Sequence, residues 1–221
     1  MPDSKSFSRV ARHPRTVELD GVGIRAGLVA MALSLPLAAL AEDVSLDIRG
    51  LDEGRLLTNV RNTVPTPEMA CDAPRARLQS YLRDAERRAL SALRALGHFN
   101  ALVDTRVDVT GACPKLVLAI EAGPAVRLDR VDIRIVGPFD DDPSAVRFRE
   151  GLRLRVGDEL DQGVYDSTRD DLINRARARG YLDARYVERE LWVDPEQNIA
   201  RVTLVLESGA RYHFGEIRAD Q

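Results

Sequence analysis

The segment Gly97-His98-Phe99-Asn100-Ala101 returns 83 residues later as Gly180-Tyr181-Leu182-Asp183-Ala184. A second match, from Glu121-Ala122-Gly123-Pro124 to Glu207-Ser208-Gly209-Ala210, has a similar spacing of 86 residues. A fixed period of this kind indicates an array of like modules. We therefore expect one module over 42–124, a second over 125–208, and the beginning of a third over 209–221.

Residues 1–41 have the composition of a secretory signal peptide. Basic residues lead into an uncharged apolar run, and a small-x-small pattern precedes the predicted cleavage site between Ala41 and Glu42. The run has 16 residues, fewer than the roughly 20 of a spanning helix; an uncleaved membrane anchor is the alternative. Cleavage would remove five basic and three acidic residues and change the formal net charge from −3 to −5. An exported acidic chain argues against a nucleic-acid partner, which usually meets a basic face.

The two cysteines, Cys71 and Cys113, both fall in the first module. An even pair in an oxidising compartment usually forms a disulfide. Neither belongs to a CxxC pair or has a histidine at metal-ligand spacing, so neither redox catalysis nor zinc binding is expected. In the predicted topology both cysteines reach the same end of the module. A bridge would close a loop of about 40 residues and stabilise the fold by about 3–4 kcal/mol. The alternative is two free thiols slightly too far apart.

The first module is predicted to run strand, helix, helix, strand, strand. Alternation of apolar and polar residues indicates strands at 44–48, 103–109 and 115–121. A short helix ends before Pro65, and a longer helix follows Pro74, until Gly97 closes it as a left-handed cap. The apolar stripe of the longer helix is Leu78, Tyr81, Leu82, Ala85, Ala89, Leu93 and Leu96.

The second module repeats this order. Strands are expected at 128–136, 184–193 and 200–207, and helices begin at Asp142-Pro143-Ser144 and after a capping Asp161. The inward stripe of the longer helix is Tyr165, Thr168, Leu172 and Ala176. Tyr186 and Leu191 belong to opposite phases of the alternation in one strand. A β-bulge within 187–190 would reconcile them; the alternative is that Tyr186 faces solvent.

These elements predict an α+β fold of tandem modules, each a three-stranded mixed sheet covered on one face by two helices. Residues suited to catalysis are scarce. His98 and His213 fall in different modules, and Asp140-Asp141-Asp142 lacks the ligand spacing of a calcium loop. We interpret His98 as a packing residue and the acidic run as a solvated loop with a helix-capping Asp; His213 lies on the linker side of the last module. Neither enzymatic activity, nor a cofactor, nor a metal ion is therefore expected.

The open edges of such sheets are the candidate binding sites. Unpaired backbone groups on an edge strand can pair with an incoming extended chain, which recognises the main chain rather than a sequence. Asp104, Arg106 and Asp108 would discourage self-pairing of one such edge.

The pattern resembles that of POTRA domains, the periplasmic repeats of the outer-membrane assembly superfamily. The resemblance rests on the β-α-α-β-β order, on the step after each long helix at Gly97 and Gly180, and on the Glu-Ala/Ser-Gly ending of each module. Within that superfamily, segments 46–51, 95–99, 176–183 and 208–215 are most similar to the TamA type of autotransporter assembly factor.

The resemblance implies a role rather than an active site. In the family the second strand of a module lies at the sheet edge and the third lies in the middle, so 101–109 and 184–193 become the strands for augmentation. The implied binding residues are Val103, Asp104, Thr105, Arg106, Val107, Arg189 and Leu191.

The resemblance also implies partners. TamA-like proteins carry three POTRA domains and a β-barrel in the outer membrane, and they work with an inner-membrane-anchored, TamB-like partner. Their clients are unfolded outer-membrane proteins or autotransporters. This chain stops at Gln221, inside the third module and before any barrel, so we interpret it as a fragment or a truncated product.

The predicted function is the periplasmic arm of an outer-membrane assembly factor, held at the periplasmic face of the outer membrane. One alternative is the arm of a BamA-like or two-partner-secretion transporter. Others are a free periplasmic module that binds peptides or proteins and, last, a small hydrolase.

Overall fold

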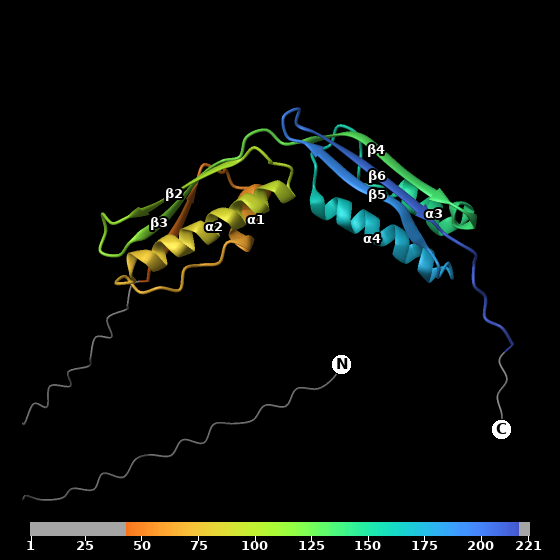
Figure 1. Cartoon of the computed structure of the whole chain (residues 1–221), viewed down its shortest axis with the longest axis horizontal. Coiled ribbons are helices and arrows are strands. Elements are labelled where there is room, and N and C mark those ends of the chain that lie inside the picture. Colours follow the sequence, from red (N-terminus) through yellow and green to blue (C-terminus); the bar gives the residue numbers. More distant parts are fainter. Residues whose placement is uncertain (1–42, 217–221) are drawn as a thin grey trace, which may run out of the picture. The chain divides into compact units, whose positions relative to one another are not determined.

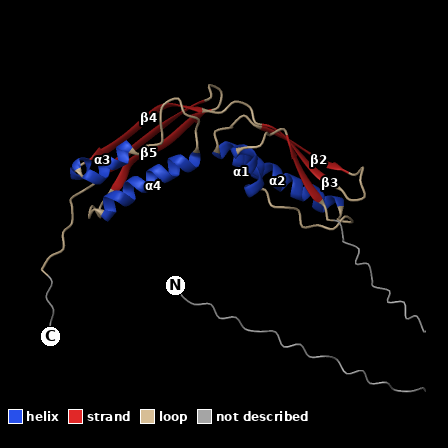
Figure 2. Cartoon of the chain, turned by 180° about the vertical axis from the view of Figure 1, so that it is seen from behind, coloured by secondary structure: helices blue, strands red, loops and turns tan. Residues whose placement is uncertain are grey.

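Two three-stranded mixed sheets with helices against them make up residues 43–216, the part of the chain that the computed structural model describes (Figure 1). The predicted signal peptide, with its cleavage site at Ala41 and Glu42, lies outside the described residues, as do residues 217–221. The predicted α+β class is confirmed. Figure 2 shows the strands of each sheet on one side and the long helices on the other.

The first module runs β1 (Ser45–Arg49), α1 (Arg55–Thr63), α2 (Arg75–Ala95), β2 (Leu102–Asp108) and β3 (Lys115–Glu121). The strand order is β1-β3-β2, with β1 parallel and β2 antiparallel to the central β3. The third strand therefore lies in the middle, as the resemblance implied. The strand β2 ends at Asp108, one residue earlier than predicted.

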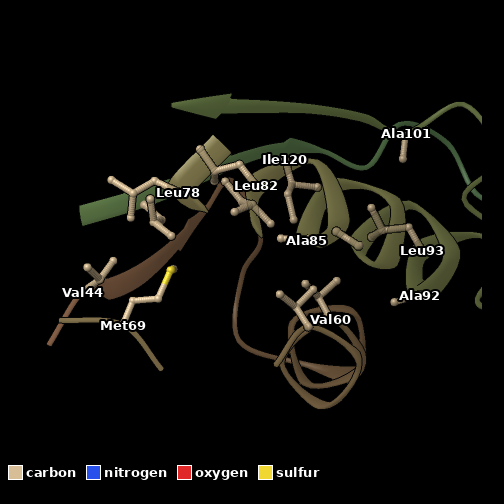
Figure 3. Close-up of a cluster of buried hydrophobic side chains, with 14 residues drawn as sticks. Val44, Val60, Met69, Leu78, Leu82, Ala85, Ala92, Leu93, Ala101 and Ile120 are labelled. Carbon is tan, nitrogen blue, oxygen red and sulfur yellow. The ribbon is translucent and has the colours of Figure 1, made fainter. Parts of the chain in front are cut away.

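One apolar cluster holds the first module together (Figure 3). The stripe predicted on α2 supplies much of it: Leu78, Leu82, Ala85, Ala89 and Leu93 are buried, whereas Tyr81 and Leu96 are half-buried. Val60 of α1 and Ile120 of β3 close the cluster from the other two sides. Each large side chain buried in this way stabilises the fold by about 1.5–3 kcal/mol.

The second module runs β4 (Arg127–Val136), η1 (Pro138–Asp141), α3 (Pro143–Glu150), α4 (Gln162–Ala178), β5 (Arg185–Asp194) and β6 (Ile199–Glu207). Its strand order is β4-β6-β5, again with one parallel and one antiparallel pair around the central strand. The short 3-10 helix η1 was not predicted. It positions Phe139, which is fully buried against Tyr181 with ring centroids 5.2 Å apart.

Two carboxylates begin the helices of this module, as predicted. Asp142 accepts a hydrogen bond from the Ser144 N–H (2.8 Å), and Asp161 accepts one from the Val164 N–H (3.2 Å). These bonds satisfy backbone donors that the first turn of a helix leaves unpaired. The predicted inward stripe of α4 is buried at all four positions, Tyr165, Thr168, Leu172 and Ala176.

The predicted bulge in the fifth strand is confirmed. The register of β5 against β6 shifts between Tyr186 and Glu188, which leaves Val187 as the extra residue. Tyr186 is half-buried, and its hydroxyl donates to the Arg169 carbonyl (2.6 Å). Tyr186 therefore does not face solvent.

The cores of the two modules stay separate, but Phe99 of the first module packs against the second, and Arg55 of the first forms an ion pair with Asp161 of the second. Phe99 follows the first long helix but packs against the apolar cluster that contains Val126 and Leu160. The Val126 N–H donates to the Gly97 carbonyl (2.9 Å), and the Tyr212 N–H donates in the same way to Gly180 (2.8 Å). The sequence repeat is therefore matched by a repeated hydrogen bond, in which the segment after each module binds the glycine that ends its long helix. Residues 209–216, the described part of the predicted third module, contain neither helix nor strand.

Candidate functional site

The strand β2 presents an uninterrupted open edge. All seven of its residues pair with β3, from Leu102 opposite Glu121 to Asp108 opposite Lys115, without a register shift. Within residues 43–216 no other strand pairs with β2. A row of backbone N–H and C=O groups is thus left without a strand partner. An incoming extended chain could pair with this row as an added strand.

The side chains of β2 separate into two rows. Val103 and Val107 are half-buried and pack against the first apolar cluster. Thr105 shares their side of the strand, whereas Asp104 and Arg106 are exposed on the other. The apolar row fixes the strand on its module, and the charged row keeps the opposite face solvated. Five of the predicted binding residues therefore lie together on this edge.

A turn motif closes the far end of β2. Asp108 accepts hydrogen bonds from the Thr110 hydroxyl (2.7 Å) and from the Thr110 N–H (3.0 Å). These bonds, the hydroxyl first, hold the pKa of Asp108 below its usual range. The carboxylate stays charged at neutral pH and marks where the regular edge ends.

A groove of about 420 Å³ opens beside this end of the strand. Its apolar wall combines residues from β2, from the start of α2 and from the loops near the disulfide: Cys71, Ala73, Leu78, Val107, Val109 and Pro114. Val109 is 65% exposed, so the groove is accessible from the edge. An extended chain laid along β2 would reach it with a side chain.

The disulfide lies in the wall of this groove. Cys71 and Cys113 are bonded, with their Cα atoms 4.8 Å apart. The bond joins the loop before α2 to the turn between β2 and β3. It therefore ties the edge hairpin to the helix layer at the place where the groove opens.

Two other edges are partly covered by the chain itself. The Val44 N–H, just before β1, donates to the Met69 carbonyl (2.8 Å), and Asp43 bridges to Ala70. At β4, the Leu128 N–H donates to Asp158 (2.8 Å) and the Gly157 N–H donates to Leu128 (2.7 Å). The contacts of Asp43 and Val44 lie just before β1, which is itself only five residues long, whereas those of Leu128 occupy the first part of the β4 edge. Both edges therefore offer a shorter free main chain than β2 or a partly covered one.

The edge strand β5 is open but irregular. Its bulge at Val187 interrupts the ladder, and Arg189 is exposed. Leu191 is half-buried against the second apolar cluster, and the Arg201 guanidinium lies 4.9 Å from the centre of the Trp192 ring. Bulges and charged side chains are the usual protection of an edge against pairing. The two predicted binding residues of the second module thus lie on a protected edge.

The two histidines of the described chain fall in different parts of the fold. The Nδ1 atom of His98 lies 3.0 Å from the Gly123 carbonyl, which fits a packing role after the helix cap. His213 is exposed in the segment after β6. Within residues 43–216 no group of three or more His, Cys, Asp or Glu residues is placed to hold a metal ion. No described helix is long and apolar enough to cross a membrane.

Residues 45–122 match the family model described as POTRA domain TamA domain 1. The matched range contains every strand and helix of the first module, including the β2 edge and both cysteines. The second module has the same strand order and pairing.

Three solved structures show weak similarity over most of the chain. The POTRA3-5 segment of Haemophilus influenzae BamA is 18% identical. The match spans 77% of this chain and 67% of the BamA segment, with a TM-score of 0.39. The POTRA1-3 segment of Omp85 from Anabaena is 20% identical. The match spans 74% of this chain and 59% of the Omp85 segment, with a TM-score of 0.38. CdiB from Escherichia coli is 12% identical. The match spans 82% of this chain and 30% of CdiB, with a TM-score of 0.31.

The sequence predicted the β2 edge but not the groove beside it or the cover over the start of β4. The groove combines side chains from separate segments, so no residue spacing in the sequence predicts it. The cover over β4 comes from 157–160, which the sequence shows only as an irregular stretch between helices. Val109, predicted as the last strand residue, lies just beyond β2 and is exposed at the groove.

Proposed function

We propose that this chain belongs to the periplasmic arm of an outer-membrane protein assembly or secretion factor. In this proposal, β2 binds extended segments of clients or partners by strand augmentation. The observation that carries it is the seven-residue β2 edge, which is regular, unbulged and not covered by the described chain. The family match over 45–122 supports the class of protein, and its description favours the TamA type.

The β2 edge suits a binder of many different clients. Main-chain hydrogen bonds would supply the affinity whatever the sequence of the client, because every residue except proline offers the same donor and acceptor. The apolar groove at the end of the strand would add a preference for an apolar side chain at one position. We infer that unfolded outer-membrane proteins or autotransporters are the clients and that a TamB-like, inner-membrane-anchored protein is the partner.

Site-specific photo-crosslinking tests the edge. We would place benzoylphenylalanine at Asp104 on β2 and, in a control, at Arg49 on the opposite edge of the same sheet. Both side chains are exposed in charged surroundings. The probe is an outer-membrane protein unfolded in urea and diluted into the purified chain.

The proposal predicts adducts from the Asp104 position and few from the Arg49 position. Equal yields at the two edges, or adducts only at Arg49, would show that β2 is not the binding edge. The absence of adducts at both would contradict client binding by this module altogether.

A further inference from the structure

The helices of the second module enclose a small, positively charged pocket. It has a volume of about 190 Å³ and lies between α3 and α4, away from both candidate edge strands. Arg147 and Arg153 come from α3 and the loop after it, and Arg175 comes from α4. Phe148 and Leu152 supply apolar wall.

The arginines of this pocket outnumber its carboxylates. Asp171 is the one acidic residue in the wall, and it pairs with Arg175 (2.7 Å). Arg153 donates to the Ser167 hydroxyl (3.2 Å), which carries no charge. No ion pair joins Arg147 or Arg153 to any carboxylate within residues 43–216. The lining therefore carries a formal charge of +2 in a chain whose formal net charge is −3.

Three acidic residues near the pocket pair with arginines outside its lining, whereas the exposed Glu150 has no ion pair within residues 43–216. Asp166 and Asp170 both bind Arg169, and Asp140 binds Arg149. Arg147 and Arg153 thus keep most of their guanidinium donors for a ligand, since only one nitrogen of Arg153 is used, on Ser167. Guanidinium groups suit phosphate and carboxylate because their planar fork donates two parallel hydrogen bonds.

The base of the pocket is rigid. Phe148 is 5% exposed, and both it and Leu172 of α4 belong to the apolar cluster that closes this end of the module. The Cα positions of Arg147 and Arg175 are therefore set by packed helices, and Arg153 follows directly after the buried end of α3. Such a base lowers the entropic cost of gathering several donors around one anion.

The fold does not require this charge. The helix-side pocket of the first module is lined by Glu68, Asp84 and Arg77, which gives it a formal charge of −1. At the repeat offset of 83 residues, Asp84 takes the place of Ser167, and Ala92 takes the place of Arg175. Equivalent faces of two similar modules thus carry opposite charge, and the cationic face is particular to the second.

We propose that the α3–α4 pocket binds a phosphate group, carried either by free phosphate or by the headgroup of an anionic phospholipid. The pocket is smaller than the roughly 300–1,000 Å³ of sites for drug-sized ligands, which favours a compact anion. A phosphate offers more acceptor oxygens than a carboxylate and can occupy more than one guanidinium fork. This site is independent of the β2 edge, and it would add a membrane-facing contact if the source is a lipid.

Calorimetric titration and vesicle flotation test this proposal on the purified chain. Inorganic phosphate is titrated, with acetate as the comparison anion, and flotation uses phosphatidylcholine vesicles with and without phosphatidylglycerol. The pocket variant is Arg147→Ser with Arg153→Ser. The matched control is Arg83→Ser with Arg94→Ser, which removes the same charge from exposed positions on α2 that have no ion pair within the described chain. Circular dichroism checks that both double variants are folded.

We expect the pocket variant to bind phosphate or phosphatidylglycerol vesicles at least about tenfold more weakly than the unaltered chain, since charge-assisted hydrogen bonds are lost, while the control variant binds normally. Binding to phosphate alone would identify the free anion as the source, and binding to the vesicles alone would identify the lipid. Equal weakening in both variants would show general surface attraction and overturn the proposal. So would acetate binding as tight as phosphate binding, or an unaltered chain that binds neither probe.

Discussion

At the scale of single residues, Asp142 does two tasks in the second module. It caps α3, and its two carboxylate oxygens accept from the Arg179 Nε at 3.2 and 3.1 Å, which ties the start of α3 to the end of α4. Burial raises the pKa of Asp142, but the bonds from Ser144 and Arg179 outweigh that effect and leave the pKa below its usual range. The charged form is therefore the one that the folded state favours.

Removal of this carboxylate should destabilise the module in a pH-dependent way. We expect Asp142→Ala to lower the free energy of unfolding by about 0.5–2 kcal/mol at neutral pH, the usual cost of an N-cap. The folded-state pKa is depressed, so the charge contributes above the unfolded value of about 3.9 and is lost as the pH falls through the folded value. Urea unfolding at several pH values should show the variant and the parent converging in acid. A difference that persists unchanged there, or an equal loss for Asp141→Ala at the exposed neighbouring position, would contradict this account.

At the scale of elements, the disulfide holds the β2–β3 hairpin to the helix layer. Cys71 and Cys113 are 42 residues apart in the sequence, and a loop of that length corresponds to about 3–4 kcal/mol in the entropic model. We expect reductant to lower the free energy of unfolding of the first module by about that amount and to leave the second module unchanged. Hydrogen exchange in denaturant, read separately for residues 43–124 and 125–208, measures both.

A variant without cysteines provides the control for this measurement. Cys71→Ser with Cys113→Ser should unfold like the reduced parent and should not respond to reductant. An equal effect of reductant on both modules would contradict a role confined to the first.

Adjacent residues of β2 should differ sharply in their tolerance of proline. Successive N–H groups along a strand point to opposite edges, so either Asp104 or Thr105 donates toward β3, and the other donates toward the open edge. We expect one of Asp104→Pro and Thr105→Pro to lose stability, and the other to stay folded and lose client binding. Proline at Val107 or Leu191 would be a poorer test, because those side chains pack against the cores and their loss would itself destabilise the fold. Urea unfolding measures the stability of each variant, and client pull-down measures its binding. Two stable variants that both bind clients would contradict augmentation at β2.

Features of the fold and of the candidate site could be predicted from the sequence where they depend on a few neighbouring residues. Regular spacing predicted the stripe on α2, the caps at Asp142 and Asp161, and even the bulge near Val187, because each depends on a few neighbouring residues. The 3-10 helix η1 was missed because it forms around the burial of Phe139 rather than from a local pattern. The groove beside β2 and the arginine pocket were missed for a similar reason, since each gathers residues from segments that only the tertiary fold brings together.

At the scale of the whole molecule, the described residues belong to one compact unit, although each module has its own core. Phe99 is the side chain that carries packing from one to the other. Asn100 supports it, because its Nδ2 donates to the Pro195 carbonyl (2.7 Å) in the β5–β6 turn. A Cβ at Gly97, where φ is +88°, would lie 2.9 Å from the Leu160 carbonyl oxygen, so the repeated glycine allows the close approach at this step.

Truncation of Phe99 should therefore weaken the second module more than the first. A fully buried Phe→Ala change costs about 3–5 kcal/mol, and Phe99 is half-buried, so we expect roughly 1–3 kcal/mol from Phe99→Ala. Hydrogen exchange in denaturant reports each module separately. Leu182→Ala is the matched control, since this repeat counterpart of Phe99 is 60% exposed and should cost little. A loss confined to the first module would show that Phe99 does not couple the two.

Hydrogen exchange of the β2 amides with and without an unfolded outer-membrane protein tests the central claim most directly. If an extended client adds a strand to the first sheet, the outward N–H groups of residues 102–108 should gain protection on binding. Those of β1, β4 and β5 should change little. Protection that appears on another strand, or client binding that leaves the β2 amides exchanging as before, would contradict the account.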